Sequence, residues 1–191
     1  PGGTLLDAGC GTGALVRAIS KRGIDAWGFD LDPGFVARAR AELMTESARV
    51  VLGDLVGIGS VFPEKRFDAI VCLGQTFPHL LADSEVHAFL RGAGKRLVTG
   101  GRLVLQVVSD RDDRPDRILP VLEASGTKLH RRRILTGADR AELRLSATGE
   151  AGDVEWKVVH RRWTPESLGR FAETDGYQVS AVVADESGAA W

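Results

Sequence analysis

The chain has 191 residues, of which 43% are hydrophobic and 27% charged, a balance typical of a single globular domain rather than a disordered chain. A formal net charge of −1 provides no overall positive field for nucleic acid, and no apolar run reaches the roughly 18 residues of a membrane span. Two cysteines make no disulfide framework, so we expect a reduced, cytoplasmic setting.

The first half of the chain alternates short apolar runs with helical patterns. We predict strands at about 4–8, 24–30, 48–54, 67–74 and 101–108, and helices at about 14–22, 33–44 and 84–98. Gly23 suits the end of the first helix, and Asp32 followed by Pro33 suits the start of the second. This alternation predicts an α/β fold, a Rossmann-like doubly wound, mostly parallel sheet with helices on both faces.

The pattern changes after about residue 109. A helix is predicted at about 115–123, followed by an antiparallel meander of three stretches, 128–135, 141–147 and 154–163. Thr164 and Pro165 then predict the start of a helix, and 177–185 returns to strand. We expect one domain: a core of about 1–110 and 164–191, with about 111–163 as a helix plus an antiparallel β insertion over the ligand edge. The chain opens on Pro1 and closes on an apolar segment, so elements are expected to be missing at both ends.

The stretch LLDAGCGTG, residues 5–13, is a glycine-rich turn between a predicted strand and a predicted helix. Gly9, Gly11 and Ala14 fit the G-x-G-x-x-A spacing of dinucleotide sites, with Asp30 where a ribose-binding acid belongs. However, a diphosphate over this loop would be opposed by the Asp7 carboxylate by about a few kcal/mol. S-adenosylmethionine carries an ammonium and a sulfonium instead, so a nearby acid favours it. A turn needed only for packing is the simpler alternative, but acids at three predicted strand ends count against it.

These motifs resemble the first three motifs of class I S-adenosylmethionine-dependent methyltransferases, in order: LLDAGCGTG, GFDLD, and GD at Gly53 and Asp54. The resemblance covers the first half of the chain and implies an enzyme that uses S-adenosylmethionine. It implies Asp30 on the ribose, Asp54 at the adenine amino group, and Leu31 and Leu55 against the adenine ring. It also implies cofactor contacts from the glycine loop, the second glycine–aspartate pair and the loop after the fourth strand, through Asp7, Gly9, Cys10, Gly11, Gly13, Gly53, Leu73 and Gly74.

The stretch FDAIVCLGQTFPHL, residues 67–80, bears on the methyl acceptor. It resembles the corresponding loop of glycine and sarcosine N-methyltransferases, C-L-G-N-S-F-A-H-L. Here Gln75 replaces the asparagine of that loop, and Pro78 precedes His79. The antiparallel insertion is similar to that of amino-sugar N-methyltransferases. The resemblance implies a small amine acceptor, and the loop differs from the N-P-P-Y of DNA amino-methyltransferases, so a nucleic-acid base is not expected.

Several readings of the function remain open from sequence. A neutral amine needs little help from a base, whereas a hydroxyl acceptor needs one, and His79 or His160 is the candidate. We therefore predict N-methylation of a small molecule, with Gln75 and His79 facing the acceptor. The alternatives are O-methylation with a histidine base, a cofactor-binding subunit without catalysis and, more distantly, a nicotinamide reductase. The identity of the acceptor and the choice between monomer and homodimer stay open.

Other charged and sulfur-bearing groups have simpler explanations. The basic run 130–133, with Arg161 and Arg162, would suit an anionic substrate group, but we favour a solvated strand face. Three acids between residues 110 and 113 are interpreted as a polar loop, so no metal site is predicted. Cys10 and Cys72 are expected to be inert small fillers.

Overall fold

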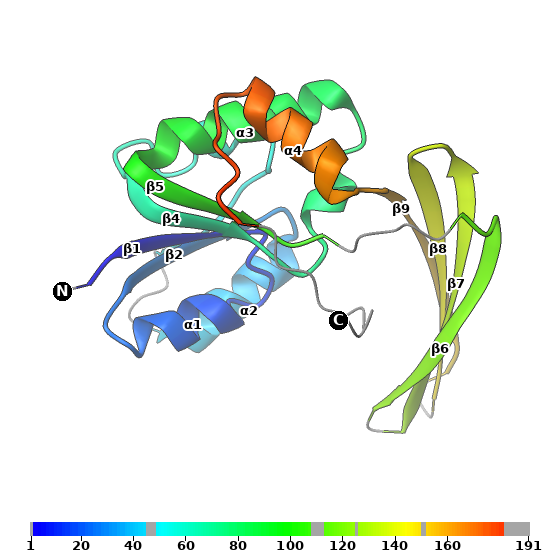
Figure 1. Cartoon of the computed structure of the whole chain (residues 1–191). Helices are drawn as coiled ribbons and strands as arrows, with labels where there is room; N and C mark the ends of the chain where they lie inside the picture. Colours follow the sequence, from blue (N-terminus) through cyan, green and yellow to red (C-terminus); the bar gives the residue numbers. More distant parts are fainter. Residues whose placement is uncertain (1, 45–48, 108–112, 125, 150–151, 182–191) are drawn as a thin grey trace.

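The computed structural model describes residues 2–44, 49–107, 113–124, 126–149 and 152–181. A parallel sheet has the order β3-β2-β1-β4-β5, with α1 and α2 on one face and α3 and α4 on the other (Figure 1). Its strands are β1 (Thr4–Ala8), β2 (Asp25–Asp30), β3 (Val50–Leu52), β4 (Phe67–Cys72) and β5 (Leu97–Leu105). The helices are α1 (Ala14–Ser20), α2 (Pro33–Leu43), α3 (Asp83–Arg96) and α4 (Pro165–Thr174). The predicted Rossmann-like fold class is confirmed.

The predicted helix starts follow from local chemistry. The Asp32 carboxylate accepts hydrogen bonds from the amides of Gly34 (2.7 Å) and Phe35 (3.0 Å), two of the donors that a helix start leaves unpaired. Pro33 occupies the first turn of α2, where its missing N–H costs nothing. At α4 the Thr164 hydroxyl accepts from the Ser167 amide (3.1 Å), so this predicted cap is also confirmed.

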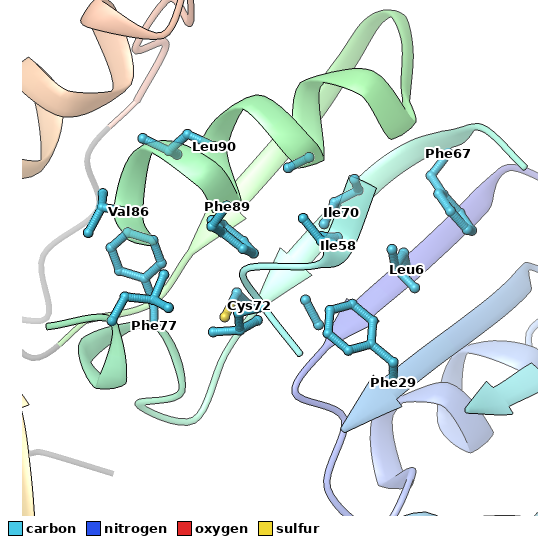
Figure 2. Packing of buried hydrophobic residues seen from close by; sticks show 14 of the residues in the cluster. Leu6, Phe29, Ile58, Phe67, Ile70, Cys72, Phe77, Val86, Phe89 and Leu90 are labelled. Atoms are coloured by element: carbon cyan, nitrogen blue, oxygen red, sulfur yellow. The ribbon is translucent and has the colours of Figure 1, made fainter. Parts of the chain in front are cut away.

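The main hydrophobic core lies between the parallel sheet and α3. Figure 2 shows Phe89 of α3 pointing toward the strands, and Ile58, Ile70 and Cys72 belong to the same buried cluster. A smaller cluster fills the opposite face, where α1 and α2 cover the sheet. Since both faces of the inner strands are covered, β1, β2 and β4 are largely apolar and carry most of their polar groups near their ends, whereas the edge strand β5 keeps several exposed residues.

A second, antiparallel sheet follows β5 in the chain. It has the order β6-β7-β8-β9, formed by β6 (Asp116–Ala124), β7 (Thr127–Gly137), β8 (Arg140–Thr148) and β9 (Val154–Arg161). Figure 1 shows this sheet beside the parallel core rather than stacked on either face of it. It contacts the core through the short 3-10 helix η3 (Phe77–His79), which follows β4. The three predicted meander strands are confirmed.

The helix predicted at 115–123 is wrong, because this segment forms strand β6. Pro120 explains the difference: within a helix it would remove a hydrogen bond and clash with the preceding turn. At the edge of a sheet its missing N–H is tolerated, and β6 is an edge strand whose register shifts between Leu119 and Leu122.

The strand predicted at 177–185 is not present in its described part, residues 177–181, and the remainder lies outside the described residues. Tyr177 provides the physical reason. Its hydroxyl donates to the Leu90 carbonyl (2.7 Å), which fixes the chain after α4 against α3 instead of against the sheet edge. In the described part of the chain, no helix is long and apolar enough to cross a membrane.

The N-cap of α2 gives a direct test of this local account. Replacing Asp32 by alanine (Asp32→Ala) leaves the Gly34 and Phe35 amides without the carboxylate. We expect a loss of about 1 kcal/mol in the free energy of unfolding, measured by urea denaturation. Asp32→Ser keeps a capping oxygen and should retain most of the stability; equal losses in both variants would contradict the capping role.

Candidate functional site

The candidate site lies where the order of strands reverses direction, between β1 and β4. The loops that follow these two strands touch each other: a Cβ atom at Gly9 would overlap the side chain of Thr76. Gly9 also has a φ of 82°, in the left-handed region that favours glycine. The glycine is therefore required here both by backbone conformation and by the close approach of the second loop.

The glycine loop is held in place by the end of β2. The amides of Gly9 and Cys10 both donate to the Phe29 carbonyl, each at 2.9 Å. The Gly11 amide donates to one carboxylate oxygen of Asp30 (2.8 Å), and the Asp32 amide donates to the other (3.0 Å). Both oxygens of Asp30 are thus aligned by backbone donors, yet each keeps a second lone pair for a ligand hydroxyl.

The residues expected at an adenine ring differ in exposure. Leu31, directly after Asp30, is 68% exposed and offers an apolar surface at the strand edge. Leu55 instead is buried in the main core, so it has much less surface available to a ligand. One Asp54 oxygen accepts from the Val56 amide (3.0 Å), and the Gly53 amide donates to the Asp30 carbonyl (3.0 Å). This last bond joins the loops after β2 and β3.

Asp7 is a buried carboxyl group at the end of β1, only 4% exposed. Burial raises its pKa to about 7, and the neighbouring Asp30 charge adds to the increase. None of the ion pairs among the described residues involves Asp7. A positively charged ligand group at this edge would therefore stabilise the ionised form, whereas a phosphate would oppose it.

The two thiols lie close to this carboxyl group. Cys10 in the glycine loop and Cys72 at the end of β4 are free and buried. Burial raises the pKa of each thiol to about 12, with a further contribution from Asp7. Neither thiol is available as a thiolate nucleophile near neutral pH, as expected for small fillers.

The loop after β4 is folded back on itself. The Leu73 carbonyl accepts from the Thr76 hydroxyl (2.9 Å), and the Gly74 amide donates to the side-chain oxygen of Gln106 (2.9 Å). Gly74 and Gln75 have φ values of 68° and 69°. A left-handed conformation is unusual for a non-glycine residue and is often found at functional sites, so it draws attention to Gln75.

The structure brings together the two histidines that the sequence singled out separately. His79 ends η3, where its amide donates to the Thr76 carbonyl (3.1 Å), and His160 comes from β9. Their ring centroids are 4.7 Å apart and the planes lie at 87°, an edge-to-face contact. Burial lowers the pKa of both rings, that of His160 to about 4 with a further effect of His79. Near neutral pH both rings are uncharged and able to accept a proton or a hydrogen bond.

The arginines of the antiparallel sheet have partners within the chain. Arg132 pairs with Asp116, Arg131 donates to the Pro120 carbonyl (2.8 Å), and Arg162 pairs with Asp113 (2.9 Å). These contacts support structural roles rather than a fork for an anionic substrate group. Of the acids considered for a metal, residues 110 and 112 lie outside the described residues. Within the described ranges, no cluster of three or more His, Cys, Asp or Glu side chains could hold a metal ion.

Sequence reasoning missed two residues of the site and considered a third, Arg161, only as part of a fork for an anionic substrate group. Thr76 packs against Gly9, and Gln106 fixes Gly74. The position of Gln106 at the end of a predicted strand is a signal that could have identified it. Arg161, which follows His160, carries contacts that depend on the tertiary fold and left no local signal.

Comparison with known proteins gives a consistent result. A family profile described as "Methyltransferase domain" matches residues 5–101. Isonocardicin synthase from Nocardia uniformis subsp. tsuyamanensis is 37% identical over 106 residues, which are 54% of this chain and 33% of that protein. Demethylmenaquinone methyltransferase from Tropheryma whipplei (strain Twist) is 36% identical over 110 residues, 54% of this chain and 41% of that protein. The chain thus spans between a third and about two fifths of the length of these two relatives.

The solved structures give a longer match. CalS10, an amino pentose methyltransferase from Micromonospora echinaspora that was solved with S-adenosylmethionine bound, is 27% identical with a TM-score of 0.68. The match covers 92% of this chain and 75% of CalS10, so it includes the antiparallel sheet as well as the parallel core.

The buried carboxyl group predicts an unusual pH dependence. Because the pKa of Asp7 is raised from 3.8 to about 7 on folding, the folded state binds more protons than the unfolded state between these values, and its stability falls as pH rises. Asp7→Asn removes this cost. The quantity to measure is the free energy of unfolding of the variant minus that of the wild type, from urea denaturation. We expect this difference to be about 2 kcal/mol larger at pH 8 than at pH 5. Asp153→Asn at an exposed position is the control; the same difference at both pH values would refute the account.

Proposed function

The chain belongs to the methyltransferase domain family, and on that premise we propose that it transfers a methyl group from S-adenosylmethionine to the nitrogen of a small-molecule amine. The observation that carries this proposal is the buried Asp7 carboxyl group beneath the glycine loop. A carboxylate in this position favours a ligand with positive charge and disfavours the diphosphate of a dinucleotide. The proposal therefore separates a methyltransferase from a nicotinamide reductase on electrostatic grounds.

The donors and acceptors at the strand ends fit this cofactor. Asp30, already aligned by the Gly11 and Asp32 amides, would accept the two ribose hydroxyls. Asp54 would accept from the adenine amino group, while the exposed Leu31 side chain would cover the ring. Leu55 would contribute less to the ring contact than the resemblance implied, because its side chain belongs to the core.

The acceptor would lie at the other side of the site, between the β4 loop and β9. When bound, the cofactor supplies a methyl group on a positively charged sulfonium. The chain then has to hold the acceptor in line with that group and exclude water. Gln75 and His79 would contact the acceptor, and the antiparallel sheet would act as a lid that brings His160 to the same place. An amine that arrives as an ammonium ion must lose a proton first. The uncharged His79 ring would be the acceptor for it, because the His160 ring, with its pKa lowered to about 4, is a weak base.

Nitrogen is preferred as the acceptor atom because the β4 loop resembles that of small-amine N-methyltransferases, and the similarity to the amino pentose methyltransferase CalS10 extends over both sheets. One observation favours a second candidate, O-methylation. The contact between His79 and His160 provides an uncharged base, which is what a hydroxyl acceptor requires.

The role of Asp30 can be tested with the product S-adenosylhomocysteine. Asp30→Asn removes the negative charge and one pair of acceptor positions, and hydrogen bonds to charged groups contribute about 1.5–3 kcal/mol each. We expect the dissociation constant, measured by isothermal titration calorimetry, to rise by about tenfold to a hundredfold. Asp25→Asn, at the opposite end of β2, is the matched control and should bind as the wild type does. Unchanged binding by Asp30→Asn would contradict the ribose assignment.

The acceptor class can be tested with methyl-labelled S-adenosylmethionine and a panel that pairs amines with matched alcohols, including glycine, sarcosine, amino sugars and small phenols. We expect label in amines only. His79→Ala should then lower turnover modestly, because an amine depends on positioning more than on a base. Label in hydroxyl compounds would overturn N-methylation and predicts a loss of about 10²–10⁴-fold in His79→Ala or His160→Ala. Cofactor binding without label in any compound would place the acceptor or a required partner outside the panel, whereas label in any compound would rule out the subunit that lacks catalysis.

A further inference from the structure

Arg161 ends β9 directly after His160 and is 90% buried in its side chain, with 10% exposed. Successive residues of a strand point to opposite faces, so Arg161 leaves β9 on the side away from His160. Its guanidinium lies 4.6 Å from the ring centre of Trp163 and 4.9 Å from that of Phe171 in α4. Arginine stacks well on aromatic faces, and the contact with Phe171 fixes the end of β9 against α4.

The same guanidinium forms two ion pairs with other parts of the chain. Its Nη1 atom lies 2.6 Å from a carboxylate oxygen of Asp83, the first residue of α3, and its Nε atom lies 3.4 Å from Asp139 in the turn between β7 and β8. The Nη1 contact is not aligned as a hydrogen bond, so its attraction is that of an ion pair. One side chain therefore joins the antiparallel sheet to two helices of the core.

These contacts lie beside the segment that carries the other histidine. Trp163 is 1% exposed, and its ring packs on Phe77 at 5.3 Å between centroids. Phe77 begins η3, which ends at His79. In addition, Arg140 of β8 donates to the Leu81 carbonyl, two residues after His79. The end of β9 and the η3 segment are thus held by one continuous set of contacts.

An edge-to-face contact between two rings contributes only about 0.5–1.5 kcal/mol, too little to hold a whole strand in place. The ion pairs and aromatic stacking of Arg161 provide the additional attraction that holds the end of β9 in place. We infer that Arg161 is a positioning residue, which seats His160 against His79 by fixing the end of β9 on α3 and α4. Arg161 acts through His160 and does not touch the acceptor. Its importance for turnover rests on the proposed function, whereas its effect on the geometry of the histidine pair does not.

The test compares Arg161→Ala, Arg161→Lys and Asp83→Asn with the wild type. The matched control is Arg144→Ala, which removes an ion pair with Glu142 on the same sheet but leaves the end of β9 unchanged. The first readout is the pH titration of the His160 ring by NMR, assigned with His160→Gln. The second is the dissociation constant for S-adenosylhomocysteine, and the third is turnover with the acceptor found in the labelled panel.

In the wild type, His160 should titrate near its lowered pKa of about 4. In Arg161→Ala, the His160 ring becomes more exposed to solvent, and we expect its titration midpoint to rise by about one pH unit or more toward 6.5. Arg161→Lys keeps the charge but not the planar stacking and should give a smaller rise. Arg144→Ala should titrate as the wild type does. Binding of S-adenosylhomocysteine should change less than about twofold in Arg161→Ala, while kcat falls by about tenfold or more.

An unchanged His160 midpoint in folded Arg161→Ala would overturn the inference. Should this variant fail to fold, Asp83→Asn decides the question, because it removes one charge partner at a side chain that is 68% exposed. It should raise the midpoint in the same direction by a smaller amount, and no change would overturn the inference. If the wild type does not bind S-adenosylhomocysteine but the variants show the expected shifts of the His160 midpoint, the proposed function alone is contradicted.

Discussion

The end of β2 is the constraint on which the site depends. Five backbone amides, from the loops after β1, β2 and β3, donate to the carbonyls of Phe29 and Asp30 or to the Asp30 carboxylate. Buried or crowded amides without partners are costly, so these loops can come together only where β2 supplies acceptors. One strand end thereby fixes the glycine loop, the start of α2 and the segment after β3 relative to one another, and leaves Asp30 aligned for a ligand.

The two sheets have different roles in the fold. The parallel sheet buries both faces and gathers carboxyl groups at its edge, including Asp7, which destabilises the folded chain as pH rises toward 7. The antiparallel sheet contributes little to that core; it is attached mainly through Trp163 and a few arginines at one end. Such an attachment is sensitive to single side chains, and it determines where His160 meets the β4 loop.

Most of the fold could be predicted from sequence, because its signals are local. The caps at Asp32 and Thr164 and the apolar strand runs require only neighbouring residues. The segment 115–123 was misassigned because its apolar residues fit a helical spacing as well as a strand with an irregularity at Pro120, and only its position at a sheet edge decides between them. Likewise, His79 and His160 could each be named from sequence, but their contact, and the part of Arg161 in it, depend on packing between segments far apart in the chain.

The two buried cysteines have a practical consequence. Cys10 belongs to the glycine loop and Cys72 to the end of the inner strand β4, and both thiols are shielded and protonated in the folded chain. A thiol-specific reagent at neutral pH therefore reacts only when the protein opens. Cys72 packs in the main core and Cys10 in the smaller cluster on the opposite face of the sheet. Their separate labelling rates would distinguish opening of the ligand loop from unfolding of the whole domain, with no engineered probe.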